Sequence, residues 1–245
     1  NHDPVPIREL AGAMVALEAI IHRTPRVFEQ LFPGTQIQRV DVLVDKLQSG
    51  SLTEDFLIKF LFQDQANFDT FVGKLRKLTG MDKLSAANPL FAVVVIALLL
   101  AGAQQAVSLL AGDDSKPDPV LQQTSNTIIN IGAEATELTP QQFEAIIRSA
   151  AGNKAERTAL AKSALEVVAP ARRNPGARIV FDNTAATTVT PSVIGAIPQS
   201  LAGDDAEPHE VVEDHASVLV QFRATDLDKT QAGWGALIPS ISERR

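Results

Sequence analysis

The sequence contains no cysteine and no tyrosine, and its only tryptophan is Trp234. The absence of cysteine excludes disulfide bonds, zinc–thiolate sites, iron–sulfur clusters and cysteine nucleophiles. Aromatic residues make up 5% of the chain and nearly all of them are Phe, which argues against a base-stacking platform for single-stranded nucleic acid. The formal net charge of −7 also lacks the basic balance of a nucleic-acid-binding protein. We therefore expect no nucleic-acid partner.

Local motifs for catalysis and cofactor binding are missing as well. The sequence has no GxxxxGK[ST], GxGxxG, GxSxG or HExxH pattern. His209 and His215 lie among acidic residues, a composition that can bind a divalent metal, although a solvated acidic loop explains it more often. We predict no cofactor, no metal site and no catalytic residue. A soluble enzyme whose site is assembled from scattered residues remains an alternative.

What the sequence does contain is a long stretch, from Leu90 to Gly112, without a charged side chain. Asn88 is a favourable N-cap, Pro89 suits a first helical turn and Gly112 suits a C-terminal stop. These signals predict a helix of about 23 residues, or roughly 34 Å at 1.5 Å per residue. Such a helix is longer than the hydrocarbon core of a bilayer, which is roughly 30 Å thick.

This apolar helix supports two interpretations. Its strictly apolar part, Leu90–Ala103, has a length more typical of a buried core helix or an interfacial segment. A helix that is apolar on all faces must be covered on all sides, however, and a chain of 245 residues has few places to bury one this long. We therefore predict a single transmembrane span, with a soluble core helix as the alternative.

The charges on the two sides of the apolar helix differ. Residues 1–83 have a net charge of −1, whereas residues 113–245 have a net charge of −6. Basic side chains precede the helix and acidic ones follow it, which fits the positive-inside rule with the N-terminal part cytoplasmic. These flanking residues are Lys74, Arg76, Lys77 and Lys83 before the helix, and Asp113, Asp114 and Asp118 after it.

Small residues recur four positions apart within this helix, and two glutamines lie beside them. In lipid, small residues let helices approach closely, and glutamine side chains form hydrogen bonds between helices. We therefore predict a homo-oligomer that associates through this helix. The candidate positions are Ala97, Ala101, Gly102, Gln104, Gln105 and Ala106.

Elements on the N-terminal side of the apolar helix follow from periodicity. Helical spacing of apolar residues predicts a helix over 6–23, and Thr24 followed by Pro25 predicts the N-cap and first residue of a second helix. Alternating apolar residues on both sides of "QSGS" favour a β-hairpin within 37–62, with two short helices as the alternative. A further helix is expected over 67–83.

On the C-terminal side, Thr139 predicts the N-cap of a helix that ends near Gly152, and a second helix is expected to end at Pro170. Together these two helices form a predicted helical hairpin. Residues 124–132 show no clear pattern. From Ala177 onward the sequence is rich in β-forming residues, and "TTVTPSVIGAIP" and "SVLVQFRATD" are expected to be strands.

These elements predict an α+β chain with four parts. They are an N-terminal α/β unit (1–83), the apolar helix (84–112), a linker with the helical hairpin (113–176) and a small β-rich domain (177–245). A small basic cluster, Arg172, Arg173 and Arg178, is a weak candidate for binding an anionic ligand or lipid headgroups; the commoner role is to complement a helix C-terminus.

The functional expectation is a single-pass, membrane-anchored and oligomerising sensor, effector or assembly protein without a catalytic site. Its expected partners are membrane lipid, further copies of itself and other proteins. One alternative is a structural or interaction subunit of a larger complex, in which the apolar helix is buried between subunits. The other is the soluble enzyme described above.

Overall fold

The computed structural model describes the residue ranges 5–48, 53–79, 89–111, 118–181, 187–201, 221–224 and 235–237. The chain divides into two compact units, Asn1–Asp205 and Ala206–Arg245. The larger unit is mostly helical. In the smaller unit, β5 (Gln221–Ala224) pairs with β6 (Gly235–Leu237) in an antiparallel ladder. The α+β class is thus confirmed in a coarse form, as a mostly helical chain with a few short strands.

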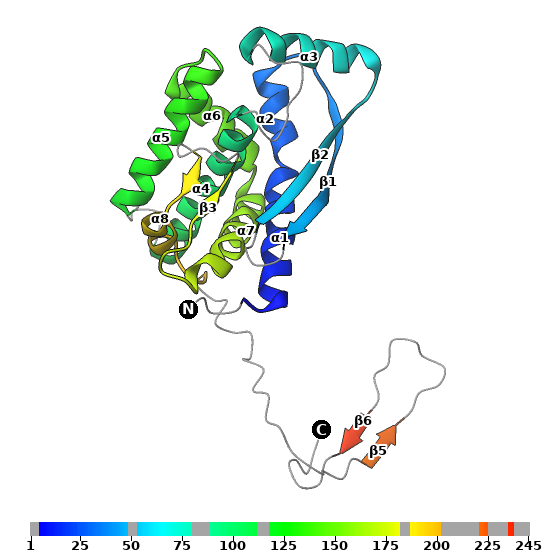
Figure 1. Cartoon of the computed structure of the whole chain (residues 1–245), viewed down its shortest axis with the longest axis vertical. Coiled ribbons are helices and arrows are strands. Elements are labelled where there is room, and N and C mark those ends of the chain that lie inside the picture. Colours follow the sequence, from blue (N-terminus) through cyan, green and yellow to red (C-terminus); the bar gives the residue numbers. More distant parts are fainter. Residues whose placement is uncertain are drawn as a thin grey trace. The chain divides into compact units, whose positions relative to one another are not determined.

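The apolar helix, α4 (Pro89–Ala111), lies in the middle of the larger unit (Figure 1). It packs mainly against α7 and α5, with further contacts to α6, α1 and α2. The covering helices are α1 (Ile7–Ile21), α2 (Thr24–Leu31), α5 (Pro119–Ala135), α6 (Pro140–Ala151) and α7 (Lys154–Arg172). The expectation that a chain of this size has few places to bury such a helix is therefore wrong, because amphipathic helices from both sides of the sequence surround it.

The predicted β-hairpin is confirmed, and the alternative of two short helices is wrong. β1 (Ile37–Gln48) and β2 (Thr53–Phe62) pair antiparallel, with Val40 opposite Phe60. These two residues belong to the face that packs against the core, whereas the Asp41–Lys59 pair occupies the other face. The alternation of apolar and polar residues therefore places one face of the hairpin on the helical core.

α3 (Gln65–Thr79) follows the hairpin, and Asp64 defines its start. The Asp64 carboxylate accepts a hydrogen bond from the backbone N–H of Asn67 at 2.8 Å. This bond satisfies one of the unpaired N–H groups of the first turn. It also lowers the pKa of Asp64, with the Asn67 side-chain amide adding a second hydrogen bond.

Three local expectations need correction, and proline is involved in each. α2 begins at Thr24 itself, whose hydroxyl donates to the carbonyl of Ile21 at 2.8 Å, so that Thr24 is not the N-cap.

α7 does not end at Pro170 but continues to Arg172 with Pro170 buried inside it. Near a C-terminus, the hydrogen bond that proline cannot donate is one of the last in the helix. Residues 191–196, expected as strand, form α8 (Pro191–Ala196), with Thr190 as N-cap.

A helix was also missed. α5 covers the segment 124–132 that had no clear pattern. Its N-cap is Asp118, whose carboxylate accepts from the backbone N–H of Val120 at 2.8 Å, and Pro119 occupies the first position. Both residues lie in the stretch that the sequence predicts as a linker. An Asp-Pro pair at the start of a helix is the same signal that Thr139-Pro140 provides for α6.

The short strands β3 (Ile179–Val180) and β4 (Thr188–Val189) pair with each other. The neighbouring α8 contacts α5 and α7, so this region belongs to the larger unit. The division of the sequence into four parts stays a prediction. Within the described residues, however, the N-terminal helices, the apolar helix and the α6–α7 hairpin pack together in that one unit.

Candidate membrane-active helix and its cover

The exposure of α4 changes along its length. Leu90 and the whole run from Ala92 to Leu100 are buried, whereas Gln104, Gln105 and Ser108 are partly exposed. Of the apolar window of this helix, 72% is buried inside the chain. α4 is also the one helix, among the described residues, that is long and apolar enough to cross a membrane. The apolar run therefore forms the centre of the core, and the polar second half of the helix reaches the surface.

The closest approach between α4 and its cover occurs at Gly102. A Cβ atom at this position would lie 2.6 Å from the carbonyl oxygen of Leu160 and 2.9 Å from Cβ of Ala164. Real side chains do not tolerate such distances, so glycine is required for the close contact between α4 and α7. The small residue at this position thus serves packing within the chain.

The other association candidates surround this contact. Ala97 and Ala106 are buried, and Ala101, Gln104 and Gln105 are partly exposed. In the bundle, the helix face with Gly102 is already occupied by α7 of the same chain. Association between copies of the chain stays a prediction.

A cluster of phenylalanine rings surrounds the N-terminal end of α4. Phe91 stacks on Phe28 at 6.3 Å between ring centroids and meets Phe60 edge-on at 6.1 Å. Phe28 also contacts Phe32 and Phe71, so rings from α2, β2, α3 and α4 meet there. These rings are separated in the sequence by up to 63 positions (Phe28 to Phe91), which is why no local pattern indicates the cluster. It connects the hairpin and α3 to the start of the apolar helix.

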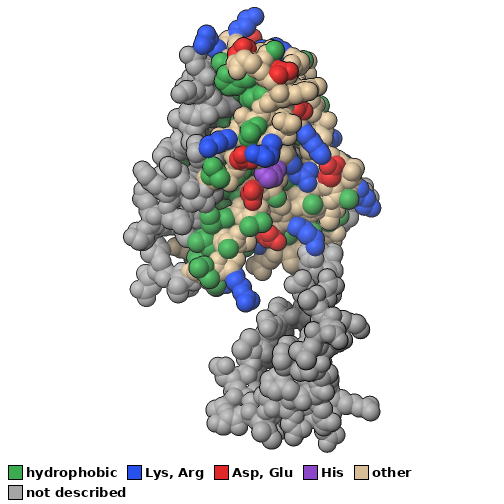
Figure 2. Space-filling view, turned by 90° about the vertical axis from the view of Figure 1, so that its right-hand side faces the viewer, with side chains coloured by type: hydrophobic (Ala, Val, Ile, Leu, Met, Phe, Trp, Pro, Cys, Tyr) green, Lys and Arg blue, Asp and Glu red, His purple; other side chains and the backbone are tan. Residues whose placement is uncertain are grey.

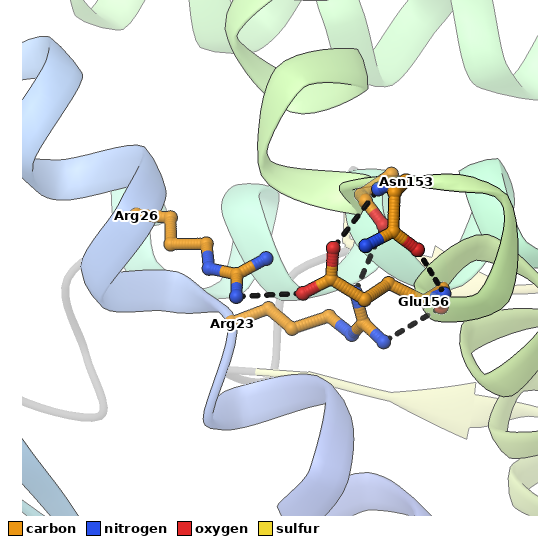
Figure 3. Close-up of polar contacts among 5 residues, drawn as sticks. Arg23, Arg26, Asn153 and Glu156 are labelled. Atoms are coloured by element: carbon orange, nitrogen blue, oxygen red, sulfur yellow. Dashed lines mark hydrogen bonds and ion pairs between the residues drawn. The ribbon is translucent and has the colours of Figure 1, made fainter.

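A polar network fastens the corner between α1 and α2 to the turn between α6 and α7 (Figure 3). The guanidinium of Arg23 donates to the carbonyl oxygens of Ala151 at 2.9 Å and Glu156 at 2.7 Å. Arg26 forms an ion pair with the Glu156 carboxylate, with 2.7 Å between Nη2 and Oε1. We call Arg23, Arg26, Asn153 and Glu156 the corner clasp. It joins α1 and α2 to α6 and α7, four of the helices that cover α4.

Glu156 is held in the corner clasp by the start of α7. Its carboxylate accepts from the backbone N–H of Asn153 at 2.9 Å, and the Asn153 side chain accepts from the backbone N–H of Glu156 at 3.1 Å. This reciprocal pair is a capping box. The hydrogen bond from Arg26, followed by that from Asn153, lowers the pKa of Glu156. Glu156 is therefore ionised at neutral pH, and burial lowers the pKa of Arg23 without removing its charge.

The three arginines predicted as a weak anion site do not share a common partner in the described residues. Arg172 donates to the carbonyl oxygens of Ile197, at 3.0 Å, and Pro198. Arg173 forms an ion pair with Glu9 of α1, with 2.6 Å between Nε and Oε2. Arg178 is exposed. Two of the three side chains thus fasten α7 to other parts of the larger unit, and a ligand at this cluster stays a prediction.

Among the described residues, no group of three or more His, Asp or Glu side chains lies close enough to hold a metal ion. A shallow, open depression beside β2 and α3 contains one carboxylate, Asp64, which is engaged in capping α3. His209, His215 and Trp234 lie outside the described residues.

Sequence reasoning identified the helix but not the residues that hold its cover. The Asn153–Glu156 capping box is visible in the sequence as Asn-x-x-Glu before a helical pattern, which is a local signal for the start of α7. The arginine partners of Glu156 and the Glu9 partner of Arg173 are more than a hundred positions away, so no local signal reveals them. Comparison of the chain with protein-family models, curated proteins and solved structures gave no match.

Proposed function

We propose that this chain is a non-enzymatic membrane effector, which keeps a membrane-spanning helix covered inside a helical bundle and releases it into a lipid bilayer. One observation carries the proposal: a helix of 23 residues, with no charged side chain, lies at the centre of a cover made of amphipathic helices. Its length corresponds to roughly 34 Å, enough to cross a hydrocarbon core of roughly 30 Å.

α4 cannot be covered by the bundle and inserted in a bilayer at the same time. α7 packs along α4 and exposes charged side chains, including Lys154 and Glu166, on its other side. A charged residue at the centre of a bilayer costs about 2.5 to 3.5 kcal/mol even on the mildest scale. α4 therefore enters lipid only after α7 has moved away from it. The membrane protein expected from the sequence and the bundle described above are then two states of one chain.

Release of α4 into lipid preserves most of its hydrophobic stabilisation. Hydrocarbon tails are about as apolar as leucine side chains, so moving the helix from the core into a bilayer does not expose it to water. The twelve Leu, Ile, Val and Phe residues from 90 to 111 contribute roughly −4 to −7 kcal/mol to insertion. The main cost is opening the bundle, and the amphipathic helices α1, α5 and α6 reduce that cost if they settle at the membrane interface.

The orientation of the chain in the membrane and its association with further copies both follow from the inserted state of α4. The basic flank before α4 and the acidic flank after it favour a single span with the N-terminal part on the cytoplasmic side. Once α7 has left, the face with Gly102 is free to pack against the same face of another copy. We therefore propose that the inserted chain is a homo-oligomer, in which α4 serves as an anchor or lines a pore.

A second candidate function is supported by the burial of α4. With 72% of its apolar window covered, α4 suits a permanent core helix, and the protein is then a soluble interaction subunit. On the face shown in Figure 2, acidic and basic side chains of the described residues alternate with small apolar patches. Such a surface is compatible with water and with protein partners. This candidate predicts that the chain never enters a membrane.

A reversible lock on the bundle distinguishes the two functions. Because the chain has no cysteine, Glu9→Cys with Arg173→Cys introduces two unique thiols where an ion pair joins α1 to α7. A short bis-maleimide with a reducible linker then holds the two helices together. We expect the linked chain to be extracted from vesicles by carbonate, and the same sample to resist extraction after the linker is cut.

The chain with Arg173→Cys alone, treated with the same reagent, is the matched control. Complete extraction of the cut sample supports the soluble interaction subunit. The linker holds α7 to α1 in the bundle, so equal resistance of linked and cut samples contradicts the requirement that α7 moves away before α4 enters lipid.

A further inference from the structure

α5 differs in charge from the other helices that cover α4. Residues 119–133 contain no charged side chain, and the one charged residue of this helix is Glu134 in its last turn. By contrast, α1, α2, α6 and α7 each contain both acidic and basic residues. The charges that require α7 to leave α4 before insertion are therefore absent from most of α5.

The inner side of α5 belongs to the same core as α4, and the two helices pack against each other. Leu121 and Ile128 are buried in that core, and Gly132 lies against the ring of Phe143 of α6. Seven residues, 112–118, join α4 to α5, so α5 runs back beside α4. An uncharged helix that is already packed on α4 has no charge that forces it to leave when α4 enters lipid.

The outer side of α5 is a row of uncharged polar side chains, which we call the amide row. Its members are exposed: Gln122, Gln123, Asn126, Thr127 and Asn130. Amides both donate and accept hydrogen bonds, so the amide row suits water and not lipid tails. On the outside of a soluble bundle such a row also needs only water, but the other covering helices meet that need with charged residues. One apolar side and one uncharged polar side is a composition that suits the lining of a water-filled pore.

We propose that α5 enters the bilayer together with α4 as a helical hairpin, and that the amide row lines a water-filled pore between copies of the chain. The proposal rests on the proposed function and extends its single span by a second, because α5 leaves the interface and crosses back. Only the connection 112–118 then crosses the membrane, whereas a single span carries α6, α7 and the chain after them across. Small inorganic ions of either sign pass, since the lining has no charge.

The length and polarity of α5 set the conditions for this state. Its 17 residues correspond to roughly 26 Å, slightly less than a hydrocarbon core of roughly 30 Å. A short span is accommodated by local thinning of the bilayer or by association of the helices. Because amides that face hydrocarbon are costly, α5 is stable in the membrane only in an assembly with water at its centre. Association and conduction are therefore expected together.

Ionic current through a planar bilayer in a gradient of potassium chloride tests the lining. We expect the unmodified chain to conduct with a reversal potential close to zero, because the amide row is uncharged. Asn126→Asp is expected to shift the reversal potential toward that of potassium, and Asn126→Lys toward that of chloride, because a ring of charges in a pore selects counter-ions. A purely structural role of Asn126 does not produce shifts of opposite sign.

Matched variants place the same charges on α7, the covering helix that leaves α4. Ala159 is exposed on α7, and we expect Ala159→Asp and Ala159→Lys to conduct with the reversal potential of the unmodified chain. Thermal unfolding of all four variants shows whether the bundle is intact before it meets the bilayer.

Three outcomes overturn the proposal. They are the absence of current with the unmodified chain, the same reversal potential for Asn126→Asp and Asn126→Lys, and equal shifts with the Ala159 variants. The last would place α7 rather than α5 at the pore.

Carbonate extraction of the chain linked between positions 9 and 173 separates this proposal from the proposed function. We expect current only after the linker is cut. If the cut chain resists carbonate but carries no current, insertion of α4 stands and the pore lined by α5 fails. If the cut chain is removed by carbonate, the proposed insertion itself fails, and the pore fails with it.

Discussion

α4 and α7 are the two longest helices in the described part of the chain, with 23 and 19 residues, and they pack against each other. α7 is amphipathic: Leu160 and Ala164 face the core, and Lys154 and Glu166 face water. α4 has no charged residue on any side and is buried along its first half. α7 is therefore suited only to the boundary between core and water, whereas α4 is suited equally to a protein core and to lipid.

Under the proposed function, this difference identifies which helices would hold the chain in its covered state. A helix that is stable in only one environment fixes the structure, and here α7 and the corner clasp do so. A helix that is stable in two environments takes whichever one its cover permits. Polar contacts between the covering helices hold the cover of α4 together, namely the corner clasp and the Glu9–Arg173 pair.

The largest difference in unfolding free energy between the two helices is expected when a lysine is placed on each of them in turn. Leu98 is fully buried in α4, and Leu98→Lys leaves an unpaired charge in the core, with an expected loss of about 3 to 5 kcal/mol in unfolding free energy. Ala159 is exposed on α7, and Ala159→Lys is expected to change it by no more than about 0.5 kcal/mol. Urea unfolding followed by circular dichroism measures both. Equal losses would break the comparison between the two helices.

A smaller effect, with opposite signs, is expected at two helical glycines. Gly102→Ala places a methyl group against the Leu160 carbonyl and Ala164, and we expect a loss of about 1 to 3 kcal/mol. Gly12 of α1 has no atom within 4 Å of an added Cβ, so Gly12→Ala is expected to stabilise by about 0.4 to 1 kcal/mol. Thermal unfolding shows whether each substitution lowers or raises the stability of the fold. Stabilisation by Gly102→Ala would mean that α4 and α7 are not in close contact.

The smallest effect is expected from the charge in the corner clasp. Because the pKa of Glu156 is lowered in the folded chain, ionised Glu156 stabilises the fold above its ordinary pKa of about 4.3. That contribution is lost as the pH falls through the lowered pKa. Glu156→Gln keeps an oxygen for the capping box but removes the charge. We expect a modest decrease in Tm at pH 7 that shrinks as the pH falls below the ordinary pKa and disappears below the lowered pKa of Glu156, with Glu166→Gln as the control.

A decrease in Tm that persists in acid would assign the effect to packing rather than to the ion pair. A decrease of the same size in Glu166→Gln would show that any lost acidic charge on α7 has this effect.

The sequence predicted elements where a local signal was sufficient. Thr139-Pro140 and the alternation around "QSGS" correctly predicted α6 and the hairpin, because capping and strand alternation depend on neighbouring residues. α5 was missed because Asp118-Pro119 resembled a linker, and α8 was missed because β-branched residues in a short helix favour strand. The bounds of α4 agree with its flanks, since Pro89 suits a first helical position and Gly112 suits a C-terminal stop.

The cover of α4 was not predictable from the same signals. Whether an apolar helix is buried in protein depends on contacts such as Gly102 with Leu160, which join parts of the chain that are distant in sequence. The same applies to Arg23 with Ala151 and to Phe28 with Phe91. Composition shows that α4 must avoid water, and only tertiary contacts show what covers it.

The most direct test of the central claim is the depth of α4 in a bilayer. Ala101 lies at the middle of α4 and is partly exposed, so Ala101→Cys accepts an environment-sensitive fluorophore as the only thiol in the chain. Ala159→Cys on α7 is the matched control. After addition of anionic vesicles, we predict that nitroxides at the bilayer centre quench the label at position 101 and leave the label at position 159 unquenched. A vesicle-bound chain whose label at position 101 is not quenched at any depth would contradict the account and make α4 a permanent core helix.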